Sequence, residues 1–316
     1  MKNIAFIDTE VSPETNQILD FGAVKINDES LHATSLGEFM KFIKGEQYLC
    51  GHNVINHDIK FLYKSIGEGE YEDFIEHLNI IDTLFLSPLL FPRKPYHALV
   101  KDDKLQVDEL NNPLNDAKKA RNLFFDEVEA FRALPNLLKR IYYFLLKDTV
   151  EFGAFFKYIM DYQISTDAIH VRIFKYFQNR ICCNVDIRKI IKESPIELAY
   201  CLAFIQADDE YSIAPRWVVI NYPKVDRIMN LLRGNPCIPG CSYCNEKLDA
   251  KKGLKTFFGY EEYRSFDGVP LQEQAVKAAI NNKSLLAVFP TGGGKSITFQ
   301  IPALMAGKNT KGLTVV

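Results

Sequence analysis

The hydrophobic pattern of the first residues predicts a buried strand that ends in acidic side chains. Residues 3–10 read Asn-Ile-Ala-Phe-Ile-Asp-Thr-Glu, so largely apolar positions are followed by Asp8 and Glu10. Side chains two apart on a strand point to the same face, and both carboxylates are therefore expected side by side. Two such charges favour a cation between them, and Mg²⁺ takes oxygen ligands of this kind. The alternative is a solvated turn, and acidic residues further along the chain decide between the two.

The pattern that follows predicts a mixed α/β unit. Residues 17–26 are expected to form a second strand, antiparallel to the first because the connection is short. A short helix is expected over 38–43 and a buried strand over 48–53. The apolar residues of 59–66 share one helical face, which places Asp58 in the first turn of a helix.

A fourth acidic residue begins another helical pattern. The apolar residues of 117–124 recur at helical spacing, and Asp116 lies at the head of this helix. The chain therefore carries Asp8, Glu10, Asp58 and Asp116, in that order, at strand or helix ends. This order favours a metal site over the solvated turn.

The three motifs resemble those of the DEDD superfamily of 3′→5′ exonucleases, of the proofreading type. They are Phe6-Ile7-Asp8-Thr9-Glu10, then Gly51-His52-Asn53 with Asp58, then Asn-Pro-Leu-Asn-Asp-Ala with its acid at Asp116. The resemblance covers residues 1–130 and implies a ribonuclease-H-like mixed sheet flanked by helices. It also implies two Mg²⁺ or Mn²⁺ ions on the four carboxylates, with Asp8 shared between them. The expected substrate is DNA with single-stranded 3′ ends, while DNA versus RNA and the single- or double-stranded preference stay open.

The general base departs from the family pattern. The family variant with a histidine base carries it five residues before the last aspartate, and Asn111 stands there. An amide cannot take a proton from water near neutral pH, and general-base catalysis is worth roughly 10²- to 10⁴-fold in rate. Three explanations stay open: a slowed nuclease, sufficient metal-bound hydroxide, or another group, for which His97 is the candidate. His52 and His57 are interpreted as packed or capping imidazoles.

Residues 131–233 are expected to form a helical connector. Apolar stripes recur over 137–145 and 152–159, and further helices are expected to begin at Ser194 and Pro223. Aromatic and basic residues are interleaved here and would suit a platform for single-stranded DNA. The preferred interpretation is that the aromatic residues are core and the basic residues a solvated face.

Three cysteines stand within eight residues: Cys237, Cys241 and Cys244. Crowded thiolates favour a soft or borderline ion, so we expect Zn²⁺ or an iron–sulfur cluster. The spacing also matches the radical-SAM signature, but the sequence that follows does not predict the large barrel which that chemistry needs. A closed zinc site needs a fourth ligand, and the candidates are Cys182, Cys183, Cys201 and His170. Buried free thiols without a metal are the alternative.

The last part of the chain reads as strand, glycine-rich turn and helix. Residues 284–289 predict a buried strand and 297–305 a helix, on either side of Pro290-Thr291-Gly292-Gly293-Gly294-Lys295-Ser296. Glycines let backbone N–H groups wrap phosphate oxygens, Lys295 would meet the β and γ phosphates, and Ser296 would bind Mg²⁺. ATP with Mg²⁺ is therefore the expected ligand, although the strict P-loop pattern has a glycine where Phe289 stands.

This region resembles the RecQ-type DNA helicases of superfamily two. The matching residues are Phe258-Gly259-Tyr260, Tyr263-Arg264, Gln272 and the run from Pro290 to Leu304. The resemblance implies an incomplete RecA-like P-loop α/β segment in which Gln272 and an aromatic residue near Tyr260 hold the adenine. An acidic second motif, an arginine finger and a second lobe do not follow in the sequence. We therefore expect a fragment of an exonuclease–helicase that binds nucleotide weakly and does not hydrolyse ATP.

Composition limits the classes of function. The chain has 316 residues, 47% hydrophobic and 25% charged, with a formal net charge of −2, so DNA binding must come from local patches. Neither a signal peptide nor a membrane span is indicated, and cytoplasmic residence is expected. The expected domains are an exonuclease at 1–130, a helical connector at 131–233, and the cysteine motif with a truncated helicase lobe at 234–316. Together they predict a DNA repair or recombination enzyme, and the rival hypothesis is a catalytically weak or inactive DNA- or nucleotide-binding module.

Overall fold

The computed structural model describes residues 2–66, 78–94, 97, 99, 112–159, 168–207 and 213–315. The chain forms two compact units, Met1–Pro92 with His97–Thr166, and Arg93–Tyr96 with Asp167–Val316. The sequence suggested boundaries at 130 and 233, and that three-domain division stays a prediction. Among the described residues, no helix has both the length and the apolar character that crossing a membrane requires.

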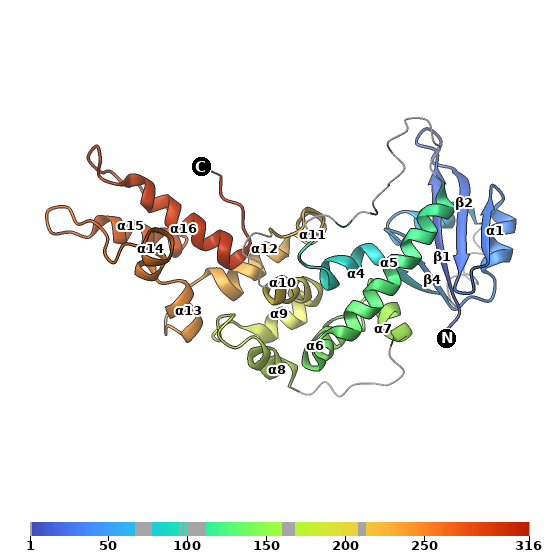
Figure 1. Cartoon of the computed structure of the whole chain (residues 1–316), viewed down its shortest axis with the longest axis horizontal. Helices are drawn as coiled ribbons and strands as arrows, with labels where there is room; N and C mark the ends of the chain where they lie inside the picture. Colours follow the sequence, from blue (N-terminus) through green and yellow to red (C-terminus); the bar gives the residue numbers. More distant parts are fainter. Residues whose placement is uncertain are drawn as a thin grey trace. The chain divides into compact units, whose positions relative to one another are not determined.

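A five-stranded mixed sheet forms the centre of the first unit (Figure 1). Its strands, in spatial order, are β3 (Ser30–Ala33), β2 (Ile18–Lys25), β1 (Ile4–Val11), β4 (Tyr48–Gly51) and β5 (Asn79–Asp82). β2 runs antiparallel to β1 and β3, whereas β4 is parallel to both β1 and β5. The predicted antiparallel pairing of the first two strands is thus confirmed.

The two faces of β1 pack against different helices. Ala5 and Ile7 share a core with Phe39 of α1 (Leu36–Ile43) and Leu62 of α2 (Asp58–Ser65). Phe6 points to the other face, where its ring centroid lies 5.6 Å from that of Phe124 in α5. Because side chains alternate along a strand, Asp8 and Glu10 share the face of Phe6. The acidic pair is therefore directed to the side of the sheet that α5 covers.

Helix α5 (Pro113–Ala133) has a well-defined start. The side chain of Asn112 caps it by accepting hydrogen bonds from the backbone N–H groups of Leu114 and Asn115, and Pro113 occupies the first turn. The buried residues Asp116, Ala120 and Phe124 follow at intervals of four, so one stripe of the helix faces the sheet. The prediction that Asp116 heads a helix is confirmed. The first unit also contains α4 (Thr83–Leu90), α6 (Asn136–Leu146) and α7 (Gly153–Ile159).

The described part of the second unit is helical. It comprises α8 (Ile169–Tyr176), α9 (Ile187–Glu193), α10 (Pro195–Ala207), α11 (Arg216–Asn221), α12 (Lys224–Met229), the short π-helix η1 (Asn230–Gly234), α13 (Ser242–Lys247), α14 (Ala250–Phe258), α15 (Leu271–Ile280) and α16 (Lys295–Thr310). The helices expected near Ser194 and Pro223 are confirmed as α10 and α12. The interpretation of the aromatic residues as core holds for Tyr142 of α6, which is 1% exposed, whereas Tyr143 and Tyr176 are partly exposed.

The buried strand predicted over 284–289 is wrong. These residues form no strand, and the side chains of Leu286 and Val288 are 91% and 79% exposed. A strand exists through hydrogen bonds to a neighbouring strand. In the described part of the second unit only the isolated bridge between Phe266 and Val269 shows β-pairing. Apolar, β-prone residues are therefore not sufficient for a strand here.

Candidate functional site

Three of the four predicted acidic residues come together. Asp8 and Glu10 from β1 and Asp116 from α5 each offer a carboxylate oxygen, and these oxygens lie within 4.8 Å of one another. Asp116 is 8% exposed, whereas Asp8 and Glu10 are partly exposed. Oxygens bound to one Mg²⁺ at about 2.1 Å stand roughly 3–4 Å apart. The separation in this group therefore fits a divalent cation, and the partial exposure leaves access from solvent.

A glycine that the sequence analysis did not single out lets α5 approach the strand. Gly22 of β2 pairs with Asp8 of β1. A Cβ atom at Gly22 would lie 2.1 Å from the carbonyl carbon of Pro113 and 2.2 Å from the nitrogen of Leu114. Only a residue without a side chain allows the first turn of α5 to lie on the sheet there. The available signal was a glycine inside a strand, which often marks a close backbone approach.

Gly22→Ala is expected to push the start of α5 away from β1. The carboxylate of Asp116 would then move away from those of Asp8 and Glu10. The overpacked methyl should reduce the free energy of unfolding by about 1–3 kcal/mol or more. It should also remove the rise in melting temperature that we expect Mn²⁺ to give the unmodified protein, because the three carboxylates no longer converge. Gly37→Ala in α1 is the matched control, since a Cβ there meets only the Ser35 hydroxyl at 3.8 Å. An unchanged Mn²⁺ response in Gly22→Ala would contradict the positioning role of Gly22.

Asp58 is the fourth predicted acid, and it is tied to the same strand in a different way. It is 2% exposed, and its Oδ1 accepts hydrogen bonds from the backbone N–H of Thr9 at 2.7 Å and from the Thr9 hydroxyl at 2.8 Å. Among the described residues, Asp58 stands outside the group of three oxygens that lie within 4.8 Å. Thr9, which lies between Asp8 and Glu10 in β1, therefore fixes Asp58 beside this strand.

His52, which is partly exposed, interacts electrostatically with Asp116. Nδ1 of His52 lies 2.9 Å from Oγ1 of Thr83. Burial, followed by the charge of His97, lowers the pKa of His52 to about 4, while Asp116 acts in the opposite direction. His97 is itself 6% exposed. An imidazole with so low a pKa is neutral at pH 7, but it is a weaker base than an ordinary histidine. Asn111, the position of the missing family base, lies outside the described residues.

Asp82 organises the turn that leads to Asp58. It is fully buried at the end of β5, and its carboxylate accepts backbone N–H bonds from Asn53 at 2.8 Å, Ile55 at 3.0 Å and Leu84 at 2.9 Å. Burial raises the pKa of Asp82 to about 7, although these three hydrogen bonds act to lower it. No sequence pattern indicates this residue, because its role depends on backbone groups brought together only by the fold.

The glycine-rich turn precedes α16 as the sequence predicted. Gly292 and Gly294 have φ values of +76° and +71°, a region that glycine enters without strain. Lys295 and Ser296 are exposed at the first turn of α16, as is Thr291 before it. The turn thus presents the lysine and the hydroxyl to solvent at a helix N-terminus, where backbone N–H groups favour an anion.

Gln272 binds the backbone of this turn. Its side chain is 1% exposed, and its amide nitrogen donates to the carbonyl oxygens of Gly293 at 3.1 Å and Gly294 at 3.0 Å. Its amide oxygen accepts from the backbone N–H of Arg264 at 2.9 Å. Gln272 therefore connects the segment before α15 to the glycine-rich turn. The adenine contact that the family resemblance implies for Gln272 stays a prediction.

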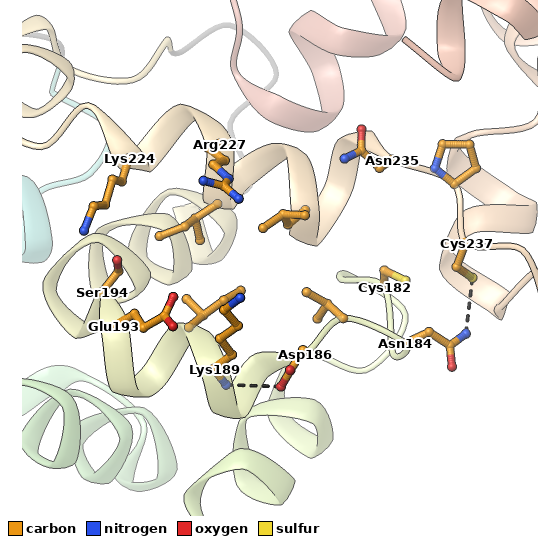
Figure 2. A pocket seen from close by; sticks show the side chains of 15 residues that line it. Cys182, Asn184, Asp186, Lys189, Glu193, Ser194, Lys224, Arg227, Asn235 and Cys237 are labelled. Atoms are coloured by element: carbon orange, nitrogen blue, oxygen red, sulfur yellow. Dashed lines mark hydrogen bonds between the residues drawn. The ribbon is translucent and has the colours of Figure 1, made fainter. Parts of the chain in front are cut away.

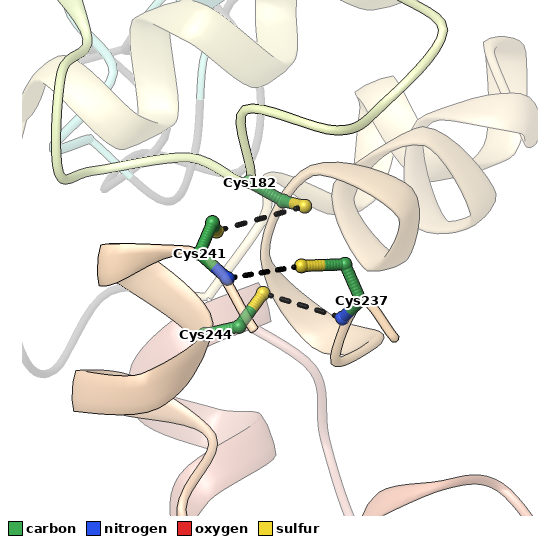
Figure 3. A group of neighbouring side chains, drawn as sticks. All are labelled: Cys182, Cys237, Cys241 and Cys244. Carbon is green, nitrogen blue, oxygen red and sulfur yellow. Dashed lines mark hydrogen bonds between the residues drawn. The ribbon is translucent and has the colours of Figure 1, made fainter. Parts of the chain in front are cut away.

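The three clustered cysteines are joined by a fourth. The sulfur atoms of Cys182, Cys237, Cys241 and Cys244 lie within 4.8 Å of one another and converge in Figure 3. Cys182 lies between α8 and α9, so the group connects segments that are far apart in the sequence. Of the other candidate ligands, Cys201 is buried in α10 with its thiol 3.5 Å from the carbonyl oxygen of Val225. Cys183 is exposed.

A cavity of about 540 Å³ adjoins the cysteines (Figure 2). Cys182 and Cys237 contribute to its lining, together with the basic residues Lys189, Lys224 and Arg227 and the acidic residues Asp186 and Glu193. Asn184, also in the lining, donates its side-chain amide to the sulfur of Cys237 at 3.2 Å. Because the charges around the cavity are mixed, they do not indicate one class of ligand.

Comparison with known proteins bears on the C-terminal segment. Residues 269–316 match the family model described as DEAD/DEAH box helicase. The chain is 44% identical over 59 residues to the ATP-dependent DNA helicase RecQ of Haemophilus influenzae, which is 19% of this chain and 9% of that protein. It is 43% identical over 47 residues to the ATP-dependent helicase SGS1 of Saccharomyces cerevisiae, covering 15% and 3% of the two proteins. The C-terminal segment is similar to RecQ-type helicases.

The match confirms the predicted helicase resemblance for this segment alone. The chain spans about a tenth or less of the length of these curated relatives. No solved structure matches. The family match includes Gln272 and the turn from Thr291 to Ser296, so the residues expected to bind nucleotide lie within the matched segment. The exonuclease resemblance of the first unit stays a prediction.

Proposed function

We propose that the first unit is a metal-dependent 3′→5′ exonuclease that degrades DNA from single-stranded ends. The observation that carries this proposal is the convergence of the carboxylate oxygens of Asp8, Glu10 and Asp116 within 4.8 Å. They come from a central strand and from the first turn of a helix that packs on it. Oxygen ligands alone, partly open to solvent, suit Mg²⁺ or Mn²⁺ rather than a softer ion.

Some residues of this site would bind the metal ions, and others orient those ligands. Divalent ions, when bound, activate a water molecule and stabilise the leaving 3′ oxygen of a phosphodiester. Asp8, Glu10 and Asp116 would hold them, with Asp58 added from beside the strand. Thr9 orients Asp58 through two hydrogen bonds. His97, which is 6% exposed, is the candidate for the group that would take a proton from the attacking water.

We also propose that the C-terminal segment belongs to a RecQ-type motor that binds ATP and acts on DNA in repair or recombination. The match of residues 269–316 to the helicase family supports this. So do the exposed Lys295 and Ser296 at the start of α16, which suit phosphate and Mg²⁺ respectively. The exonuclease would then act on strands that the motor makes accessible.

Degradation of a labelled single strand tests the nuclease. With Mg²⁺ or Mn²⁺, a 5′-labelled strand should give a ladder that shortens from its 3′ end, and a 3′ label should be released at once as a mononucleotide. Excess EDTA should stop both reactions. If Asn111→His cuts the DNA and the unmodified protein does not, the unmodified site has kept its metal ligands but lacks a general base. If the unmodified protein and Asn111→His both leave the DNA intact, and Mn²⁺ does not raise the melting temperature of either, the binding-module hypothesis is supported instead.

A further inference from the structure

We propose that Cys182, Cys237, Cys241 and Cys244 form a closed, structural Zn²⁺ site. Four thiols from two separate segments lie with all their sulfur atoms within 4.8 Å of one another. Cys237, Cys241 and Cys244 make up one segment, at or near the start of α13. Cys182 reaches them from the loop after α8 (Figure 3). Four cysteines are a common complete ligand set for zinc.

The distances select a single ion. A tetrahedral zinc site with Zn–S bonds of about 2.3 Å places its sulfur atoms about 3.8 Å apart. The sulfur atoms of Cys241 and Cys182 are 3.9 Å apart. A four-iron cluster sets iron atoms and sulfides between the cysteines, and it therefore holds them further from one another. The compact arrangement of the four thiols favours Zn²⁺ over an iron–sulfur cluster.

The surrounding polar groups suit thiolates. The backbone N–H of Cys241 donates to the sulfur of Cys237 at 3.2 Å, and the backbone N–H of Cys237 points to the sulfur of Cys244 at 3.5 Å. The side-chain amide of Asn184 is a further donor to Cys237, at 3.2 Å. Such donors offset the charge of metal-bound sulfur and fix the orientation of each ligand. Zinc binding would release the thiol protons.

A tight turn brings the first two ligands of the second segment together. Gly240 has a φ of +69°, and its N–H donates to the carbonyl oxygen of Cys237 at 3.1 Å. The chain thus reverses between Cys237 and Cys241, and Cys244 follows one helical turn later in α13. The thiols of Cys237 and Cys244, at the two ends of this segment, therefore point to the same site.

The site would anchor the helicase-like segment. Cys182 and Cys244 belong to a hydrophobic core that also contains Leu254 of α14 and Ile301 of α16. α13 is only 6 residues long, and so short a helix gains little stability by itself. A metal that joins its start to the loop after α8 would hold this core together. The proposed role is therefore structural and separate from both the carboxylate group and the glycine-rich turn.

Metal analysis of the full-length protein, purified without chelator, tests the proposal. We expect about one zinc per chain, and X-ray absorption at the zinc edge should show four sulfur neighbours at about 2.3 Å. Replacement of zinc by Co²⁺ should give the visible bands of tetrahedral thiolate coordination. Cys182→Ser and Cys244→Ser should each lower the bound zinc by more than about tenfold and reduce the melting temperature. Cys183→Ser, at the exposed neighbour of Cys182, should keep its zinc.

Several results would overturn the proposal. A structural zinc site would be excluded by iron with labile sulfide in the protein or by disulfides among the four cysteines. It would also be excluded if removal of the metal left the melting temperature unchanged. Loss of zinc in Cys183→Ser together with its retention in Cys182→Ser would show that the fourth ligand is misassigned. If the serine variants do not fold, the absorption spectrum of the unmodified protein decides, because fewer than four sulfur neighbours would contradict the site.

Discussion

Asp116→Asn is expected to slow the degradation of single-stranded DNA by on the order of 10³-fold, since metal ions contribute several kcal/mol of transition-state stabilisation. The amide has almost the same shape as the carboxylate but carries no charge. Asp116 is 8% exposed and lies close to Asp8 and Glu10, so the change should remove a proposed metal ligand without leaving a cavity. Initial rates of ladder formation on a 5′-labelled strand at saturating Mn²⁺ measure the effect.

Asp126→Asn is the matched control for this experiment. Asp126 lies in the same helix, and its side chain is exposed to solvent. It should leave both the rate and the Mn²⁺-dependent melting temperature unchanged. Equal rates for Asp116→Asn and the unmodified protein would show that the observed nuclease does not use the carboxylate group. Equal losses in both variants would trace the effect to the fold of α5 rather than to the site.

Lys295→Ala is expected to weaken ATP binding by roughly 10- to 10²-fold. A charge-assisted hydrogen bond to a phosphate is worth about 1.5–3 kcal/mol, and each 1.4 kcal/mol changes an affinity by about tenfold. Lys295 is exposed at the first residue of α16, directly after Gly294, so its removal should not disturb the packing of the helix. Titration with a fluorescent ATP analogue in the presence of Mg²⁺ measures the change.

The other end of the same helix provides the control. Lys308 is also exposed in α16, but it lies more than three turns from the glycine-rich turn. Lys308→Ala should bind the analogue as tightly as the unmodified protein. Equal affinity in Lys295→Ala and Lys308→Ala would mean that the nucleotide, if bound, does not use the predicted turn.

Local patterns predicted the parts of the site that depend on one element alone. The alternation of side chains in β1 was sufficient to place Asp8 and Glu10 together, and the helical pattern after Asp116 placed that residue at a helix start. The need for Gly22 was not predictable in the same way. It follows from the contact between β2 and Pro113, which a local pattern does not contain.

Long-range contacts also explain the remaining differences. Cys182 could not be chosen over the other candidate ligands from the sequence, because the choice depends on how the loop after α8 folds against α13. The exposed residues Leu286 and Val288 were read as a strand from their side chains. A strand also needs a neighbour, and the described part of the second unit supplies none for them.

During synthesis, the carboxylate site stays incomplete until Asp116 has emerged, long after Asp8 and Glu10. Asp8 and Glu10 leave the ribosome about a hundred residues before Asp116 does. Until α5 has emerged and has settled on Gly22, β1 presents two neighbouring negative charges without the third oxygen donor. A nascent chain stalled before Pro113 should therefore hold Mn²⁺ poorly, and tight binding of the ion would report that α5 has packed on the sheet.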